Sequence, residues 1–157
     1  MTSIIHIPLG PSNVHLILNG LLGLLLGWVA FPAVLVGLTL QAVLFQFGGL
    51  TTLGVNCLIM ALPAVVVYYT LGKAVRGDNQ TITAVISFLC GFGAVFLSSV
   101  IMAASLIFTG EAFWPMARLV IAAHLPVMVV EGIFVAVCVQ FLKKVRPEIL
   151  NVVYAGE

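Results

Sequence analysis

The first 72 residues of this chain contain no Asp, Glu, Lys or Arg, and the first charged side chain is Lys73. Over the whole sequence 7% of the residues are charged and 62% are hydrophobic, whereas about 25% of the residues in a typical soluble domain are charged. A soluble fold of 157 residues could not cover its surface with so few charges. The sequence therefore predicts an all-α, polytopic membrane protein embedded in a lipid bilayer.

A transmembrane helix needs about 20 predominantly apolar residues. We expect about five spans, at residues 13–29, 32–46, 55–72, 81–108 and 114–142. The first two are short and nearly abut, so the alternative for them is a tight helical hairpin that does not fully cross. The sequence shows no internal repeat, linker or low-complexity tract, so residues 1–157 are expected to form a single transmembrane domain.

Basic residues follow the third and the fifth predicted spans. Lys73 and Arg76 follow the third, and Lys143, Lys144 and Arg146 follow the fifth. Two crossings separate these groups, so they are expected on the same side, which the positive-inside rule makes cytoplasmic. The prediction is a multi-pass protein of the inner (plasma) membrane with its N-terminus outside and its C-terminus in the cytoplasm.

Charged and ionisable side chains inside a span need a partner or a function, because a charge at the bilayer centre costs about 2.5–3.5 kcal/mol on insertion scales. His124 and Glu131 lie seven residues apart in the last span, so both are expected on one helix face, which Pro126 bends toward its neighbours. They form either a structural polar network or a set of metal or proton ligands. Glu111 and Arg118 have the same spacing and are expected to form an interfacial ion pair.

His15 stands at the border of the first span, and Asn19 follows it by four residues. In a helix this spacing places both on one face, so we expect a His–Asn cluster at the outer mouth. Asn56 opens the third span after the outer loop and can join this cluster. Interhelical hydrogen bonding is the alternative for each amide. Gly23 and Gly27 form a GxxxG pair, which predicts close helix packing.

Several functional classes are excluded by motif and composition. The sequence has no HExxH, GxSxG or GxxxxGK[ST] motif, so we predict that the chain is not an enzyme and does not hydrolyse ATP itself. Six Lys and Arg residues in total make no basic patch for nucleic acid. The three cysteines lie far apart in apolar runs, without the spacing of a metal site.

Three segments together resemble one known family. The segments "IPLGPSNVHLILNGLLGLLLG", "QAVLFQFGGLTTLGVN" and "AAHLPVMVVEG" are similar, in this order, to the CbiM/NikM family. Its members are the substrate-capturing membrane subunits of energy-coupling-factor transporters for cobalt and nickel. The similarity covers nearly the whole chain, and the GGLTTLGxN and HLPxxxxEG patterns are specific.

The resemblance implies that the chain captures Co²⁺ or Ni²⁺ as transported cargo at its outer face, with no resident cofactor. It also implies a transmembrane coupling subunit, ATPase subunits and a small accessory membrane protein as partners. The family holds its metal with the N-terminal amine, a histidine at position two and a histidine in the motif that "PSNVHL" matches, which assigns His15 as a ligand. Asn56, His124 and Glu131 match family positions that support the site. Asn19 or a carbonyl group is expected to hold the second nitrogen of His15.

The chain departs from the family pattern at its start. Position two is Thr2, and the sequence begins just ahead of the third family helix. Either the sequence is a fragment, or another chain supplies the missing part, or this variant binds metal differently. In the last case His6 is a candidate substitute ligand, since imidazole nitrogen suits divalent cobalt and nickel; otherwise it is a chance histidine of the outer segment.

Two other functions remain open from the sequence. One is a structural or assembly subunit of the same kind of complex that does not capture metal. The other is a passive channel or carrier for a different solute, in which His124 and Glu131 belong to a proton path.

Overall fold

The computed structural model of the chain describes residues 6–9, 12–15, 18–45, 52–77, 79–109 and 114–152. Two strands come first and are followed by helices. The elements in chain order are β1 (His6–Leu9), β2 (Ser12–His15), α1 (Asn19–Leu26), the 3-10 turn η1 (Gly27–Val29), α2 (Ala30–Phe45), α3 (Leu53–Leu71), the 3-10 turn η3 (Ala74–Arg76), α4 (Gln80–Thr109), α5 (Trp114–Val145) and α6 (Pro147–Val152).

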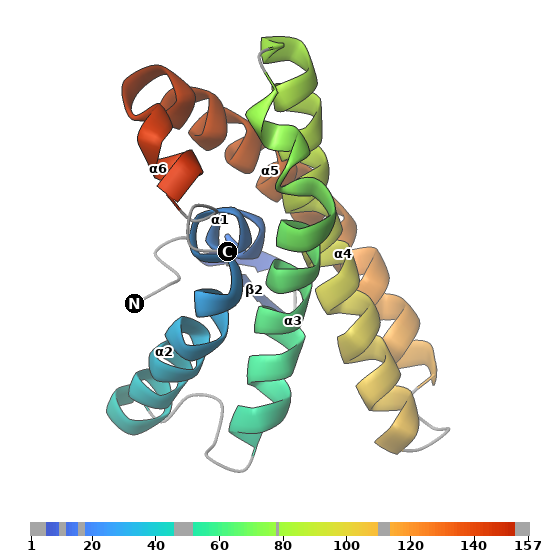
Figure 1. The fold of residues 1–157 in the computed structure, drawn as a ribbon. Coiled ribbons are helices and arrows are strands. Elements are labelled where there is room, and N and C mark those ends of the chain that lie inside the picture. Colours follow the sequence, from blue (N-terminus) through green and yellow to red (C-terminus); the bar gives the residue numbers. More distant parts are fainter. Residues whose placement is uncertain are drawn as a thin grey trace.

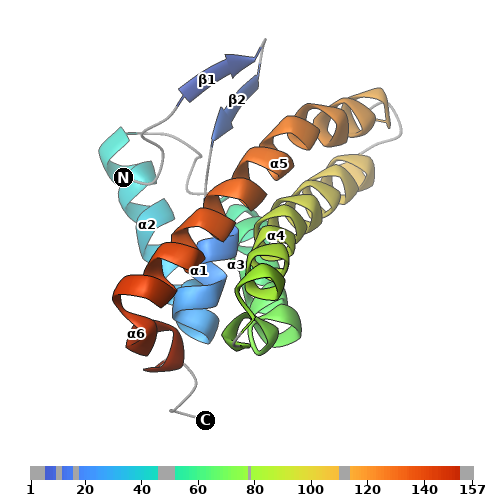
Figure 2. The same ribbon diagram turned by 90° about the horizontal axis from the view of Figure 1, so that it is seen from above.

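The helices form a bundle around the short helix α1. The two longest, α4 and α5, run antiparallel and make the most extensive contact in the molecule, and α3 packs beside α4 (Figure 1). Helix α1 contacts α3, α4 and α5, whereas α2 packs mainly on α3 at the edge. Viewed from above, the β1–β2 hairpin projects from one side of the bundle, between α2 and α5 (Figure 2). The interior of the bundle is therefore built around a helix of 8 residues.

Within the described part of the chain, four stretches are long and apolar enough to cross a membrane: Asn19–Leu44, Leu53–Leu71, Gln80–Phe108 and Trp114–Val145. Many of their outward side chains are large, apolar and exposed, such as Leu40, Val43 and Phe141, as expected where the neighbour is lipid. The polytopic helical class is thus confirmed, and the three spans predicted at 55–72, 81–108 and 114–142 agree closely with α3, α4 and α5.

The first two predicted spans, 13–29 and 32–46, are one bent stretch instead of two crossings or a close helical hairpin. Helix α1 is seen nearly end-on in Figure 1, while α2 runs obliquely away from it. The turn lies at η1, where Gly27 adopts a φ of 52°, a left-handed conformation that favours glycine. A Cβ on Gly27 would also approach the ring of Tyr68 to 2.8 Å. Among the described residues, four stretches are therefore candidate crossings by length and composition, where the sequence suggested about five.

Glycines allow α1 to enter the bundle. A Cβ on Gly20 would lie 2.6 Å from the Cα atom of Gly91 on α4, and a Cβ on Gly23 would overlap the backbone of Ala64 on α3. Close backbone approach through small residues is the usual way in which membrane helices pack tightly. The close packing predicted from the glycines of the first span is confirmed at Gly23, against α3.

The connection between α3 and α4 is joined to the C-terminal part of α5. The ammonium group of Lys143 donates to the carbonyl oxygen of Gly77 (2.6 Å) and to Oγ1 of Thr83 (2.8 Å). Gln140 Nε2 donates to the carbonyl oxygen of Gln80 (2.7 Å). These contacts place the segment after α3 and the end of α5 at the same end of the bundle, so the prediction that the two basic groups share a side is confirmed.

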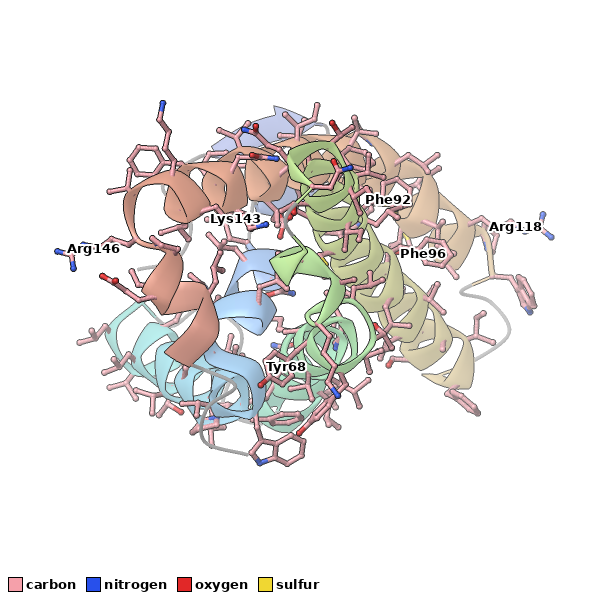
Figure 3. All side chains as sticks on the ribbon, turned by 45° about the horizontal axis from the view of Figure 1, so that its top comes forward. Tyr68, Phe92, Phe96, Arg118, Lys143 and Arg146 are labelled. Atoms are coloured by element: carbon pink, nitrogen blue, oxygen red, sulfur yellow. The ribbon has the colours of Figure 1, made fainter. Side chains whose placement is uncertain are left out.

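Arg118 lies far from that end. Figure 3 shows Arg118 and Arg146 projecting from opposite sides of the molecule, with Lys143 between them. The guanidinium carbon of Arg118 lies 5.5 Å from the centre of the Trp114 ring, a cation–π arrangement. The ion pair predicted between Glu111 and Arg118 lies outside the described residues, because Glu111 is not among them.

Two glycines of α4 provide a matched test of this packing. Gly91→Ala should lower the free energy of unfolding by about 1–3 kcal/mol, because the added methyl group meets the backbone of α5. Gly93→Ala should leave it unchanged or raise it by up to about 1 kcal/mol, because a Cβ there meets nothing within 4 Å. Thermal unfolding in detergent, followed with a thiol-reactive dye that reports buried Cys90, measures both. Equal melting temperatures for the two variants would contradict the proposed helix crossing.

Candidate metal site

His6 and His15 face each other across the hairpin. Strands β1 and β2 are antiparallel, and two residues, Gly10 and Pro11, separate them in the sequence. The register pairs are His6 with His15, Ile7 with Val14, Pro8 with Asn13 and Leu9 with Ser12. The two histidines thus form the pair farthest from the turn, at the open end of the hairpin.

The proline in β1 identifies the kind of pair. In an antiparallel ladder, hydrogen-bonded pairs alternate with non-hydrogen-bonded pairs. Pro8 has no N–H group, so Pro8 and Asn13 cannot exchange two backbone hydrogen bonds. The pair two residues along, His6 with His15, is then also of the non-hydrogen-bonded type, in which the Cα atoms are about 4.5 Å apart and side chains are closest.

The prediction that His15 and Asn19 share one helix face is wrong. His15 ends a strand, and the helix begins only at Asn19. The sequence "GPSNVH" explains the difference, since Gly and Pro favour a turn and Ser and Asn are poor helix formers. The span expected at residues 13–29 includes His15 because it is defined by apolar length alone.

Leu18 connects the hairpin to α1 in an uncommon conformation. Its φ and ψ of 54° and 32° lie in the left-handed region, which costs a non-glycine residue roughly 1–2 kcal/mol. Its carbonyl oxygen accepts a hydrogen bond from the backbone N–H of Leu22 (2.9 Å), the first bond of the helix. Leu18 therefore precedes the first turn of α1 in a conformation that cannot continue a strand.

Asn19 begins α1 and is buried, with 1% of its surface exposed. Its Nδ2 atom lies 3.5 Å from Oγ of Ser98 on α4, so its amide does take part in interhelical hydrogen bonding. Among the residues that the structure describes, no donor reaches its Oδ1 atom. A buried amide oxygen that can accept a hydrogen bond is therefore available four residues after His15.

Glu131 lies at the crossing of three helices. It is fully buried on α5, so it faces the bundle interior. A Cβ on Gly91 would approach the carbonyl oxygen of Glu131 to 2.7 Å, and Gly20 packs on the other side of Gly91. Asn19 and Glu131 are thus brought to the same crossing of α1, α4 and α5, although the sequence places them far apart.

His124 and Asn56 make local contacts. The Nδ1 atom of His124 lies 2.7 Å from the carbonyl oxygen of Val120, to which it donates, one turn earlier in α5. Seven residues separate His124 from Glu131, or about 10 Å along the helix axis. Nδ2 of Asn56 lies 3.5 Å from Oγ1 of Thr52 at the start of α3.

The helices themselves do not form a cluster of metal ligands. In the described part of the chain, no three His, Cys, Asp or Glu residues are grouped so that they could hold a metal ion. The hairpin is therefore the candidate centre, with Asn19 and Glu131 beneath it in the bundle. The sequence did not identify three residues that shape this region: Ser98, Leu18 and Gly91. Of these, only Gly91 could have been found, because it is one of two glycines in the sequence CGFG and small residues often mark close helix contacts.

Comparison with known proteins gives consistent matches. The family model CbiM, described as cobalt uptake substrate-specific transmembrane region, matches residues 1–149. A putative metal transport protein of Haemophilus influenzae is 35% identical over 152 residues, which cover 94% of this chain and 72% of that protein. The cobalt transport protein CbiM of Geobacter sulfurreducens is 28% identical over 162 residues, 97% of this chain and 47% of that protein. The fused nickel transport protein NikMN of Rhodobacter capsulatus is 36% identical over 95 residues, 56% of this chain and 27% of that protein.

The chain therefore spans most of the Haemophilus protein but about half the length of the Geobacter CbiM protein. No solved structure matches it.

Substitutions of Glu131 test its interior position. Glu131→Leu should be tolerated better than Glu131→Lys, because leucine removes a buried polar group whereas lysine introduces a longer, cationic side chain at a closely packed crossing. The yield of monodisperse protein after detergent extraction, measured by size-exclusion chromatography, compares the two. Equal yields would show that position 131 is open to water.

Proposed function

The chain belongs to the CbiM family of cobalt-uptake substrate-specific transmembrane proteins, and from this premise we propose that it captures Co²⁺ or Ni²⁺ for an ATP-driven importer. The cation is cargo rather than a resident cofactor. The chain carries no ATP-binding motif, so the energy comes from ATPase subunits, through a transmembrane coupling subunit and with a small accessory membrane protein as a further partner.

The observation that carries this proposal is the attachment of His15 to an interior helix. The resemblance assigns His15 as a metal ligand, and α1 begins at Asn19, four residues after His15 ends β2. Because α1 contacts α3, α4 and α5, an ion bound at the hairpin is connected to most of the bundle. Imidazole nitrogen is a good donor for both divalent cobalt and nickel.

The residues beneath the hairpin support capture in different ways. The buried Oδ1 atom of Asn19 can accept a hydrogen bond from the second ring nitrogen of His15, which would fix the tautomer and orientation of the ligand. Glu131 contributes a carboxyl group to the interior crossing beside α1, and we assign it, with His124 and Asn56, a supporting role. The remaining coordination positions are completed by water or by donors of another chain.

The orientation follows from the distribution of positive charge. The Lys73 and Lys143 segments lie at one end of the bundle, joined through the contact between Lys143 and Gly77. The positive-inside rule assigns that end to the cytoplasm. The chain is then a multi-pass protein of the inner membrane with its C-terminus cytoplasmic and the start of α3 outside. We assign the full crossings to α3, α4 and α5, and we propose that the bent α1–α2 stretch enters and leaves the membrane on the outer side, which keeps the N-terminus outside.

Metal uptake tests the role of His15. In cells that produce the chain with its partner subunits, His15→Ala should reduce accumulation of radioactive cobalt or nickel to the background of cells without the chain. Val14→Ala, the neighbouring residue on the other face of β2, should retain most of the uptake. Unchanged uptake with His15→Ala, at matched protein levels in the membrane, would remove His15 from the site.

Labelling of single cysteines tests the orientation. In a variant without Cys57, Cys90 and Cys138, a membrane-impermeant maleimide should label Gly54→Cys in intact cells and should label Lys144→Cys only after the cells are opened. Both positions are exposed. Gly54 lies in the first turn of α3 and Lys144 in the last turn of α5, and these two helix ends lie at opposite ends of the bundle (Figure 1). The reverse pattern would invert the proposed topology.

A further inference from the structure

We propose that His6 and His15 bind one Co²⁺ or Ni²⁺ ion together, as a pair of imidazole ligands across the β1–β2 hairpin. This inference rests on the proposed capture function and names the second protein ligand of that site. The observation behind it is the register of the hairpin, in which the two histidines are partners.

The geometry of such a pair suits a shared ion. Directly opposite residues of an antiparallel pair lie on the same face of the ribbon, with Cβ atoms about 4.5–5.5 Å apart. The non-hydrogen-bonded type deduced from Pro8 gives the closer approach. Two imidazoles attached at this separation can both reach an ion at the metal–nitrogen distance of about 2.0–2.1 Å known for zinc–histidine sites.

The composition of this face indicates a site that releases its ion. Successive residues of a strand alternate between faces, so His6 and His15 share theirs with Pro8 and Asn13. The residues that share this register face therefore include two histidines and one asparagine, and the sequence between residues 6 and 15 contains no carboxylate. A neutral ligand set leaves the double charge of the cation uncompensated, which favours reversible capture of cargo over permanent retention.

The position of the histidine pair links metal binding to the stability of the hairpin. An isolated two-stranded hairpin is marginally stable at best in water, and His6 and His15 stand at its open end, opposite the turn. An ion held by both would join the first residue of β1 to the last residue of β2. Binding free energy then contributes to hairpin formation, as at other metal sites that assemble with the fold.

The test uses the full chain in complex with its partner subunits, in detergent, with a C-terminal tag that contains no histidine, and Ni²⁺ alone as the probe. Calorimetry gives the affinity, and nickel X-ray absorption spectroscopy gives the number of imidazole ligands. The wild-type chain should show two imidazoles per ion. His6→Ala should show one and bind Ni²⁺ more than about tenfold more weakly, since even indirect changes around metal ligands cost roughly 10–100-fold.

A matched control moves the imidazole by one residue. The double variant His6→Ile, Ile7→His keeps the composition but places the histidine on the opposite face of β1. It should behave as His6→Ala does, with one imidazole and weakened binding. His6→Cys, which restores a metal ligand at the same position, should recover part of the affinity and replace one nitrogen neighbour of nickel with sulfur.

The outcomes separate this inference from the proposed function. If His15→Ala abolishes binding while His6→Ala and the double variant keep wild-type affinity and ligand number, the His6 inference is overturned and capture by His15 stands. If the wild-type complex binds neither Ni²⁺ nor Co²⁺, both are overturned. Circular dichroism and gel filtration confirm folding, and His6→Gln replaces any variant that does not fold.

Discussion

The close approach of α1 to α3 and α4 is the contact on which the rest of the arrangement depends. A helix of 8 residues is too short to be stable alone in water, and its stability here comes from burial among longer helices. Gly20 and Gly23 make that burial possible, because a Cβ at either position would overlap the backbone of α4 or α3. Once α1 is placed, Asn19 is buried at its start and Leu18 directs the hairpin away from the bundle.

In this arrangement the β1–β2 hairpin, which contains His6 and His15, precedes a bundle of apolar helices. The hairpin carries two of the chain's three histidines and no charged residue, and α1 begins four residues after its last residue, His15. Charged groups instead collect around Lys73 and Lys143, where the ammonium group of Lys143 holds the connection between α3 and α4. The uncharged histidine-bearing hairpin and the cluster of basic residues thus lie in different parts of the chain.

Much of the fold could be predicted from the sequence, because apolar length and charge position are local properties. Helices α3, α4 and α5, the shared end of the basic groups and the burial of Glu131 follow from them. The bend at Gly27 and the hairpin could not be predicted in this way. Apolar length does not show where a helix breaks, so it does not predict the bend at Gly27. The pairing of His6 with His15 follows a Gly-Pro connection, but the hydrophobic residues after it led to the prediction of a helix from residue 13. The contact of Asn19 with Ser98 joins distant segments, so only the folded chain reveals it.

Anomalous diffraction at the cobalt or nickel absorption edge, from crystals of the chain in complex with its partner subunits and loaded with metal, locates the ion directly. The account predicts that the strongest anomalous peak lies beside the β1–β2 hairpin, within bonding distance of an imidazole nitrogen of His15. A peak inside the bundle at His124 or Glu131, with none at the hairpin, would contradict it.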